Sequence, residues 1–396
     1  MGDRLNSANQ DRLWTRDFSL GFGSYMLFWA SYVFVLSTLP LYMVQRLGLS
    51  SSQVGLVGGL LALAALLVRV VSGYALDRWG RRWIYVSSLA AFMVAALGFA
   101  FTRDLLSLAV VRFVYGIPFG VVSATGTTIA GDLSPRSRRG EAVGIFLLAY
   151  TVMLAAGPAL AVLLLAKGQF ARVFAASGLL ALIGALLAAC VRFPHIRAPQ
   201  ARFGLASAFD RRALPAALLA GFQGLGYGSV MSFISLYGQK FGLPNVGLFY
   251  LVYALGQAAS RSLAGKAFDR EGPRRIIPLG YCLLMAGYSA MGLWRTPSGF
   301  LTGALAYGLG WALTWPSLQS MAIEQAPPAR RGAASCTVWN GFDLGIFVGS
   351  YALGAVAQRT GNYSSMYLAS AGILIVPLAL ALAWVLPHYR PWQGTE

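Results

Sequence analysis

The fold is decided by a stretch that the chain contains twice, RVVSGYALDRWGRR at residues 69–82 and RSLAGKAFDREGPRR at residues 261–275. Equivalent residues of the two copies lie 192 positions apart. The same offset continues downstream and relates further pairs: Tyr115 and Tyr307, Asp132 and Glu324, Pro135 and Pro327, and Gly140 and Gly332. Because chance does not hold one offset over about 70 residues, the chain consists of two copies of one half.

The composition predicts a membrane protein. Hydrophobic residues make up 57% of the 396 residues and charged residues 11%, whereas soluble globular chains contain about 25% charged residues. The 31 basic and 13 acidic residues give a formal net charge of +18. In a soluble protein this excess would suggest a nucleic-acid partner. Here the accumulation of Lys and Arg in cytoplasmic loops explains it better, and no nucleic acid is expected as a partner.

Twelve apolar runs are long enough, at about 20 residues each, to cross a lipid bilayer as helices. They lie near residues 18–43, 52–76, 83–102, 104–128, 140–164, 170–191, 214–240, 246–268, 275–294, 297–323, 332–357 and 363–386. These runs are too continuous for the strands of a barrel. We therefore expect an all-α membrane protein with two pseudo-symmetric six-helix bundles, at residues 1–191 and 214–396, joined by a basic linker at 192–213.

The distribution of Lys and Arg predicts the orientation. With the N-terminus in the cytoplasm, the inside segments hold 21 of the 31 basic residues and the outside loops hold 7. Such a bias is typical of cytoplasmic loops, so both termini are expected there. Because each half has an even number of helices, the halves keep one orientation and form parallel repeats about an axis along the membrane normal.

A motif between the second and third predicted helices resembles the signature loop of the major facilitator superfamily: Gly73-x-x-x-Asp77-Arg78-x-Gly80-Arg81-Arg82. The degenerate copy after the eighth helix is also typical of that family. Arg112, followed by Gly116 and Gly120, looks like the family's helix-four motif. Gly157-Pro158 resembles the core of a motif of proton-driven antiporters, although the flanking glycines of that motif are replaced here. The resemblance covers the whole chain and is strongest to twelve-helix proton-coupled drug and metabolite exporters.

This resemblance implies a latch that holds the cytoplasmic ends of the two halves together while the carrier is open outward. The first gating set pairs Asp77 with Arg81 and Asp132, next to the N-terminus of the helix that begins near Gly332. That helix end carries a partial positive charge, which favours a nearby anion. The full set of gating candidates comprises Asp77, Arg81, Asp132 and Arg139 in the first half and Asp269, Arg274, Glu324 and Arg331 in the second.

The substrate site of such a transporter is expected near the midplane between the halves. Aromatic and amide side chains share helix faces on the helices that line the cavity in the family. The candidates are Tyr25, Trp29, Tyr32 and Arg112 in the first half, and Gln223, Tyr227, Tyr253, Gln257, Trp311, Trp315, Trp339 and Asn340 in the second. Each aromatic residue has an alternative role as a helix contact or interfacial anchor. Gln223 and Gln257 are stronger candidates, because an amide facing lipid is costly.

Asp343 is the one carboxylate deep inside a predicted span, about 15 Å from the start of its helix, whereas Asp104 and Glu141 lie at the ends of theirs. Its repeat partner is Thr151, so the duplicated scaffold does not require the charge. A carboxylate within the membrane is costly and suggests a function, which makes Asp343 the candidate proton carrier. Arg112 is its candidate counter-ion, or an anchor for the substrate. Arg69 and Arg261 are repeat-related, which favours a structural role for both.

These features favour a proton-coupled exporter of small amphiphilic or zwitterionic organic molecules, located in a bacterial inner membrane and acting as a monomer without a cofactor. Export of an endogenous metabolite such as an opine-type metallophore, and uptake, are the alternatives within transport. An enzyme is disfavoured because both histidines, His195 and His388, lie outside the spans. No catalytic triad or metal site can be assembled around them.

Overall fold

The computed structural model describes residues 13–135, 138–165, 168–193, 209–240, 246–327 and 330–390, apart from the side chains of residues 73–75, 77, 127 and 261–271. Within these ranges the chain forms helices joined by short turns. The predicted all-α fold with twelve membrane helices is confirmed.

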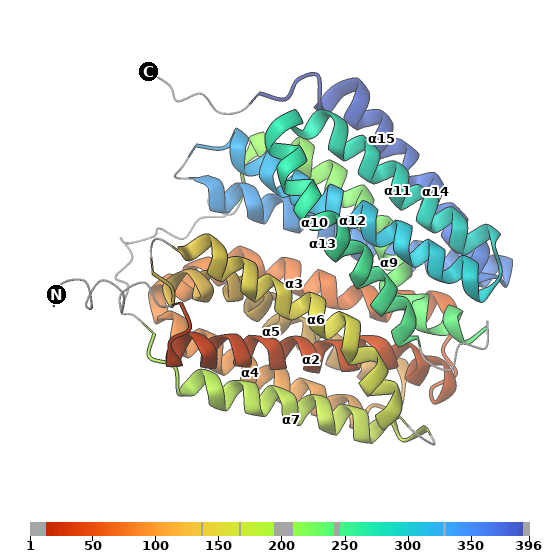
Figure 1. Cartoon of the computed structure of the whole chain (residues 1–396). Coiled ribbons are helices and arrows are strands. Elements are labelled where there is room, and N and C mark those ends of the chain that lie inside the picture. The colour runs from red at the N-terminus through yellow and green to blue at the C-terminus, as the bar shows by residue number, and fades with distance from the viewer. Residues whose placement is uncertain are drawn as a thin grey trace.

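The N-terminal bundle contains six long helices, which occupy the lower half of Figure 1. They are α2 (Arg16–Gln45), α3 (Ser51–Trp79), α4 (Arg81–Gly98), α5 (Leu105–Asp132), α6 (Arg139–Leu164) and α7 (Phe170–Ala189). A single 3-10 turn, Phe99–Phe101, extends α4. Side-chain caps fix several of the starts: Thr15 Oγ1 accepts the Phe18 amide of α2, and Asp104 Oδ1 accepts the Ser107 amide of α5 at 2.8 Å.

The C-terminal bundle repeats this order in the upper half of Figure 1. Its helices are α9 (Leu214–Gln239), α10 (Gly247–Glu271), α11 (Pro273–Leu293), α12 (Pro297–Gln325) and α13 (Arg331–Thr360), and a last span made of α14 (Tyr363–Ile373), α15 (Ile375–Leu380) and the π-helical turn Ala381–Val385. The α-helix of this last span is interrupted at Leu374 and becomes π-helical after Leu380.

The duplication is visible in the backbone as well as in the sequence. Gly80 ends α3 with a φ of 85°, and Gly272 ends α10 with a φ of 68°. A side chain is strained at such angles, whereas glycine adopts them freely. The two glycines, 192 residues apart, therefore let each half make the same sharp turn into its third helix.

Nine helices of the described chain are long and apolar enough to cross a membrane by length and composition. The spans α10, α12 and α13 are not among them, and all three belong to the C-terminal bundle. These helices carry Gln257, Asn340, three of the four candidate tryptophans and the intramembrane acid that the sequence singled out. Their polarity is consistent with helices that are covered by other helices rather than by lipid.

The two bundles meet along one seam, where α3 packs against α13 and α6 against α10, and where α9 contacts α2 and α3. We call the end of the molecule at which α7 ends and α9 begins the linker end, and the opposite end the far end. At the far end the Ser52 amide donates to Gln358 Oε1 at 3.2 Å, and Gln45 Nε2 donates to Gln239 Oε1 at 3.4 Å.

The linker end is packed differently from the far end. A Cβ built at Gly140, at the start of α6, would meet no atom within 4 Å, and the same holds for Gly332 at the start of α13. These helix starts are therefore not packed against the opposite bundle at those positions. The described conformation is closed at the far end.

Candidate functional site

A buried ion pair joins the two bundles. The Arg69 guanidinium on α3 contacts the Asp343 carboxylate on α13, and the two side chains are only 5% and 6% exposed. The guanidinium also lies 4.7 Å from the centre of the Trp339 ring and donates a long hydrogen bond of 3.4 Å to Ser123 Oγ. Among the described residues, Arg69 is the charged group that faces Asp343. A pair of this kind stabilises only while both charges are present, since either one alone is costly to bury.

Small residues on α3 bring the bundles close enough for this contact. A Cβ at Gly55 would overlap the carbonyl group of Ser350 on α13, and a Cβ at Gly59 would lie 2.8 Å from the carbonyl oxygen of Phe347. The neighbouring Gly58 would overlap the side chain of Ser232 on α9. Gly55 and Gly59 form a Gly-x-x-x-Gly pattern, which permits close helix approach in membranes. That pattern was a usable signal in the sequence, and our interpretation missed it.

Six aromatic rings run from the N-terminal bundle to the ion pair, and we call them the aromatic chain: Trp29, Tyr150, Tyr227, Trp311, Trp315 and Trp339. Successive ring centres are 4.4 Å apart for Trp29 and Tyr150, and 4.9 Å for Tyr227 and Trp311. The hydroxyls of Tyr150 and Tyr227 lie 3.4 Å apart across the seam. The chain then continues through Trp315 to Trp339, on which Arg69 lies. Five of the six were predicted from the sequence, and Tyr150 was not.

Several predicted substrate residues are buried with polar atoms that have no hydrogen-bond partner among the described residues, and Arg112, Gln223 and Asn340 have two such atoms each. Arg112 on α5 is 2% exposed, and its Nε and Nη1 atoms contact no acceptor. Gln223 on α9 is 2% exposed and Asn340 on α13 is 5% exposed, and both amide atoms of each lack a partner. Buried polar groups in proteins are normally paired, so an unpaired set suggests a place for a ligand.

The remaining predicted substrate residues pack within one bundle. Tyr25 stacks on Phe146 with ring centres 5.5 Å apart, and its hydroxyl donates to the Ser123 carbonyl at 3.2 Å. Tyr32 stacks on Phe119 at 4.6 Å. On α10, Tyr253 stacks on Tyr307 at 5.5 Å, and Gln257 is buried one turn further along.

The counter-ion of Asp343 differs from the expected one. The sequence suggested Arg112, but Arg69 occupies that position, and Arg112 instead lies 5.8 Å from the centre of the Tyr115 ring on its own helix. The repeat misled this expectation, because the equivalence of Arg69 with Arg261 pointed to a shared structural role. The acid is not shared: residue 151, the equivalent of Asp343, is a threonine.

The structure brings one pair of the predicted gating set together: the Arg81 guanidinium contacts the Asp132 carboxylate at the linker end of the N-terminal bundle. The side chains of Asp77 and Asp269 lie outside the described residues. Glu324 accepts a hydrogen bond from the Tyr389 hydroxyl of its own bundle. The other three candidates are exposed at helix starts, namely Arg139, Arg274 and Arg331.

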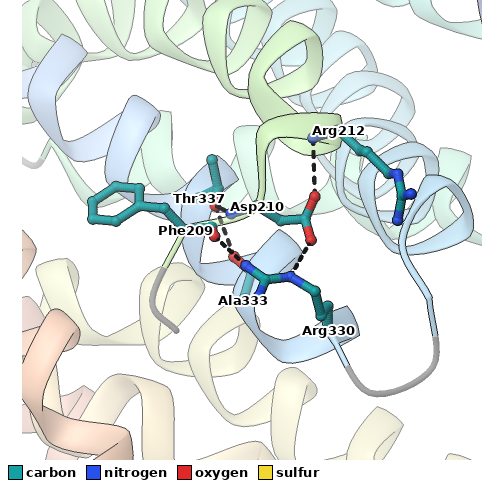
Figure 2. Close-up of polar contacts among 6 residues, drawn as sticks. All are labelled: Phe209, Asp210, Arg212, Arg330, Ala333 and Thr337. Carbon is teal, nitrogen blue, oxygen red and sulfur yellow. Dashed lines mark hydrogen bonds and ion pairs between the residues drawn. The ribbon is translucent and has the colours of Figure 1, made fainter. Parts of the chain in front are cut away.

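Residues directly before α9 are attached to the start of α13 by a cluster of hydrogen bonds, which Figure 2 shows. Arg330 Nε donates to Asp210 Oδ2 at 2.7 Å, and Arg330 Nη2 donates to the Phe209 carbonyl at 2.6 Å. The Asp210 amide donates to Thr337 Oγ1 at 2.9 Å. We call this cluster the linker clip. Burial raises the pKa of Asp210, but the hydrogen bonds from Arg330 and from the Arg212 amide outweigh it, and the pKa lies below its ordinary value.

Asp210→Asn is expected to lower the unfolding temperature in detergent, because it weakens a charge-assisted hydrogen bond to Arg330. The Asp210 side chain is 5% exposed but Arg330 is 44% exposed, so the cost is about 1 kcal/mol. The pKa of Asp210 is depressed in the folded state, so its stabilisation is present above the unfolded pKa of about 4 and is lost as the pH falls through the folded pKa. Glu141→Gln, which removes an exposed pair with Arg138, is the control. An equal effect of both substitutions on the unfolding temperature contradicts a role for the clip.

The fold consists of two repeated six-helix bundles, with a buried charge pair at their seam and buried polar groups that lack a partner among the described residues. These features define the class of secondary membrane transporters that are built from parallel repeats. The sequence model of the Major Facilitator Superfamily matches residues 21–350. The chain belongs to this family and is a multi-pass membrane transporter.

Comparisons with known proteins agree with the family. The chain is 25% identical over 383 residues to the uncharacterised MFS-type transporter YhhS of Escherichia coli (strain K12), covering 94% of this chain and 93% of that protein. Among solved structures, the nucleoside transporter NupG is 16% identical with a TM-score of 0.76, covering 96% of this chain and 100% of NupG. A bacterial homologue of the human lysosomal transporter Spinster, inward-facing and unoccupied, is 16% identical with a TM-score of 0.76, covering 96% and 98% of the two chains. At these identities the structures share the fold with this chain.

Proposed function

We propose that the chain is a proton-coupled exporter of small amphiphilic or zwitterionic organic molecules that works by alternating access. The observation that carries this proposal is the ion pair of Arg69 and Asp343, which is buried and crosses the seam between the bundles. Asp343 is an intramembrane carboxylate, and such groups mark proton relays and ion pathways in transporters. Its partner lies on the opposite bundle, so a change in its charge alters the contact between the bundles.

Protonation of Asp343 supplies the coupling step. A neutral carboxylic acid no longer compensates the Arg69 guanidinium, and a buried charge without its partner costs several kcal/mol. A conformational change that separates α3 from α13 is therefore sensitive to the charge of Asp343, and the proton gradient acts on that step.

The substrate is proposed to bind along the aromatic chain, among the unpartnered side chains of Arg112, Gln223 and Asn340. Aromatic rings offer a large apolar surface with polar edges, which suits an amphiphilic molecule. The last ring of the chain, Trp339, contacts Arg69. Arg69 also pairs with Asp343. A molecule bound against Trp339 and a proton bound to Asp343 would therefore both act on Arg69.

The proposed orientation has both termini and the linker end in the cytoplasm of a bacterial cell, which the basic residues of the predicted loops support. In that orientation the described conformation, closed at the far end, faces inward. The pair of Arg81 and Asp132 lies at the linker end and is proposed to belong to a latch that closes the opposite, outward-facing conformation. The transporter is proposed to act as a monomer in the inner membrane.

A second candidate is export of an endogenous metabolite with carboxylates, such as an opine-type metallophore. The unpartnered guanidinium of Arg112 favours it, because that group would pair with a substrate carboxylate. For either class of substrate, the alternative direction of transport is uptake driven by a proton gradient.

The test is reconstitution into liposomes with an imposed pH gradient and a panel of organic anions, zwitterions and cations. We expect at least one compound to accumulate against its concentration gradient in exchange for protons, and accumulation to stop when an ionophore collapses the gradient. Movement of compound and proton in the same direction would indicate uptake and reject export. Transport that is unaffected by the ionophore would reject proton coupling.

A further inference from the structure

The unpartnered charge of Arg112 is the starting point. Arg112 lies two turns into α5, and its guanidinium is buried in the N-terminal bundle. The groups that face it among the described residues are the rings of Tyr32 and Tyr115. Asp343 pairs with Arg69 on the neighbouring helix, and Asp104 caps the start of α5.

A buried guanidinium cannot relieve its cost by losing a proton, because arginine stays charged in proteins. A charge inside a membrane protein is normally paired with another charge or with backbone carbonyls. Neither the Nε nor the Nη1 atom of Arg112 has an acceptor among the described residues. The site therefore offers a positive charge and two hydrogen-bond donors that have no acceptor among the described residues.

The surroundings of Arg112 connect it to the aromatic chain. The Tyr32 ring stacks on Phe119 at 4.6 Å, and the ring centres of Tyr32 and Trp29 are 5.6 Å apart. Trp29 is the first ring of the aromatic chain and contacts Tyr150. An anion bound at Arg112 would thus lie beside apolar rings that continue toward the opposite bundle.

We propose that Arg112 binds the anionic group of the substrate, and that the transported compounds are organic anions with a carboxylate, sulfonate or phosphate attached to an apolar, preferably aromatic, body. The inference rests on the proposed transport of small organic molecules and narrows their class. Among the described residues Asp343 is paired with Arg69 whereas Arg112 faces no carboxylate, so the uncompensated charge is positive and favours a substrate anion over a cation. The planar guanidinium forms two parallel hydrogen bonds to such an anion, which a lysine cannot reproduce.

The experiment measures equilibrium binding and unfolding temperature on purified protein in detergent, in a gluconate buffer. The probes are naphthoate, naphthalenesulfonate and naphthyl phosphate, with neutral naphthamide, naphthylmethylammonium and inorganic sulfate as comparisons. We expect at least one aromatic anion to bind and to raise the unfolding temperature. Arg112→Gln should weaken this binding by about 30-fold or more, Arg112→Lys should weaken it less, and Arg359→Gln, at an exposed arginine of α13, should leave it unchanged.

A second measurement does not depend on the choice of probe. Without ligand, Arg112→Gln should unfold at the same or a higher temperature than the wild type, because it removes a buried charge that has no partner. Arg69→Gln should unfold at a lower temperature, because it leaves Asp343 uncompensated. A similar loss of stability in both variants would mean that Arg112 has a structural partner and would overturn the proposal.

Three other results would also overturn it. These are equal anion binding by the wild type and Arg112→Gln, stabilisation by the neutral or cationic probe alone, and full stabilisation by sulfate with no gain from the aromatic body. Transport of a neutral compound by a protein that ignores anions would reject the substrate class and leave the proposed transport intact. Anion binding without any transport driven by pH would reject the proposed coupling and leave the role of Arg112 intact.

Discussion

Asp343→Asn is expected to abolish accumulation driven by a pH gradient while preserving substrate binding and exchange down a concentration gradient. The amide keeps the shape of the side chain but does not titrate, so the step that separates α3 from α13 loses its proton dependence. In proteoliposomes the variant should bring the substrate to equal concentrations on both sides and no further. The wild type, measured with the same imposed gradient, should concentrate it about tenfold for each unit of pH if one proton is exchanged.

This substitution also leaves Arg69 buried without a charged partner, at a cost of about 3–5 kcal/mol, so the loss of accumulation needs a control for stability. The double variant Arg69→Gln/Asp343→Asn removes both charges and should recover much of the unfolding temperature. It should still fail to accumulate substrate, because no titratable group remains at the pair. Recovery of accumulation driven by pH in the double variant would show that the ion pair is only structural.

Gly55→Leu is expected to prevent closure of the far end. The backbone carbonyl of Ser350 occupies the place where a side chain at residue 55 would begin, and backbone atoms cannot move aside as the tip of a side chain can. Overpacking of this kind costs about 1–3 kcal/mol or more, which is enough to change the population of the closed state by about tenfold. Transport should slow accordingly, because each cycle passes through that state.

The measurement is disulfide formation between Ser52→Cys and Gln358→Cys, at positions that share a hydrogen bond in the closed far end, in a background without the three native cysteines. The pair should cross-link readily alone and about tenfold more slowly with Gly55→Leu. Gly144→Leu is the matched control, since a Cβ at that position in α6 meets no atom within 4 Å. Equal cross-linking of all three proteins would show that the seam of α3 and α13 does not limit closure.

The helices could be predicted from the sequence because each depends on local information. Twenty apolar residues and a capping side chain specify a membrane helix without reference to the rest of the chain, and an offset of 192 residues makes the two bundles visible. The predicted start of α9 at residue 214 agrees with the structure, and the predicted start of α2 differs from Arg16 by two residues.

The pairing of charges across the seam could not be predicted in the same way. Arg69 and Asp343 are 274 residues apart, and their contact depends on how close α3 and α13 approach, which the glycines of α3 determine. The repeat was misleading here, because it relates Arg69 to Arg261 and suggests a role that both halves share. Asp343 has no acidic equivalent in the first half, so the repeat could not indicate its partner.

The aromatic residues were easier to find, since Tyr25, Trp29 and Tyr32 share one helix face and Trp311 and Trp315 share another. Their order along the aromatic chain comes from the packing of both bundles.

The linker clip limits where the chain can be cut or extended by protein engineering. Phe209 and Asp210 precede α9, yet their hydrogen bonds belong to the C-terminal bundle. A second bundle produced as a separate polypeptide from residue 214 would lack Phe209 and Asp210, which accept hydrogen bonds from Arg330. Breaks, tags and inserted domains therefore belong on the N-terminal side of Phe209, where both bundles keep all of the contacts described here.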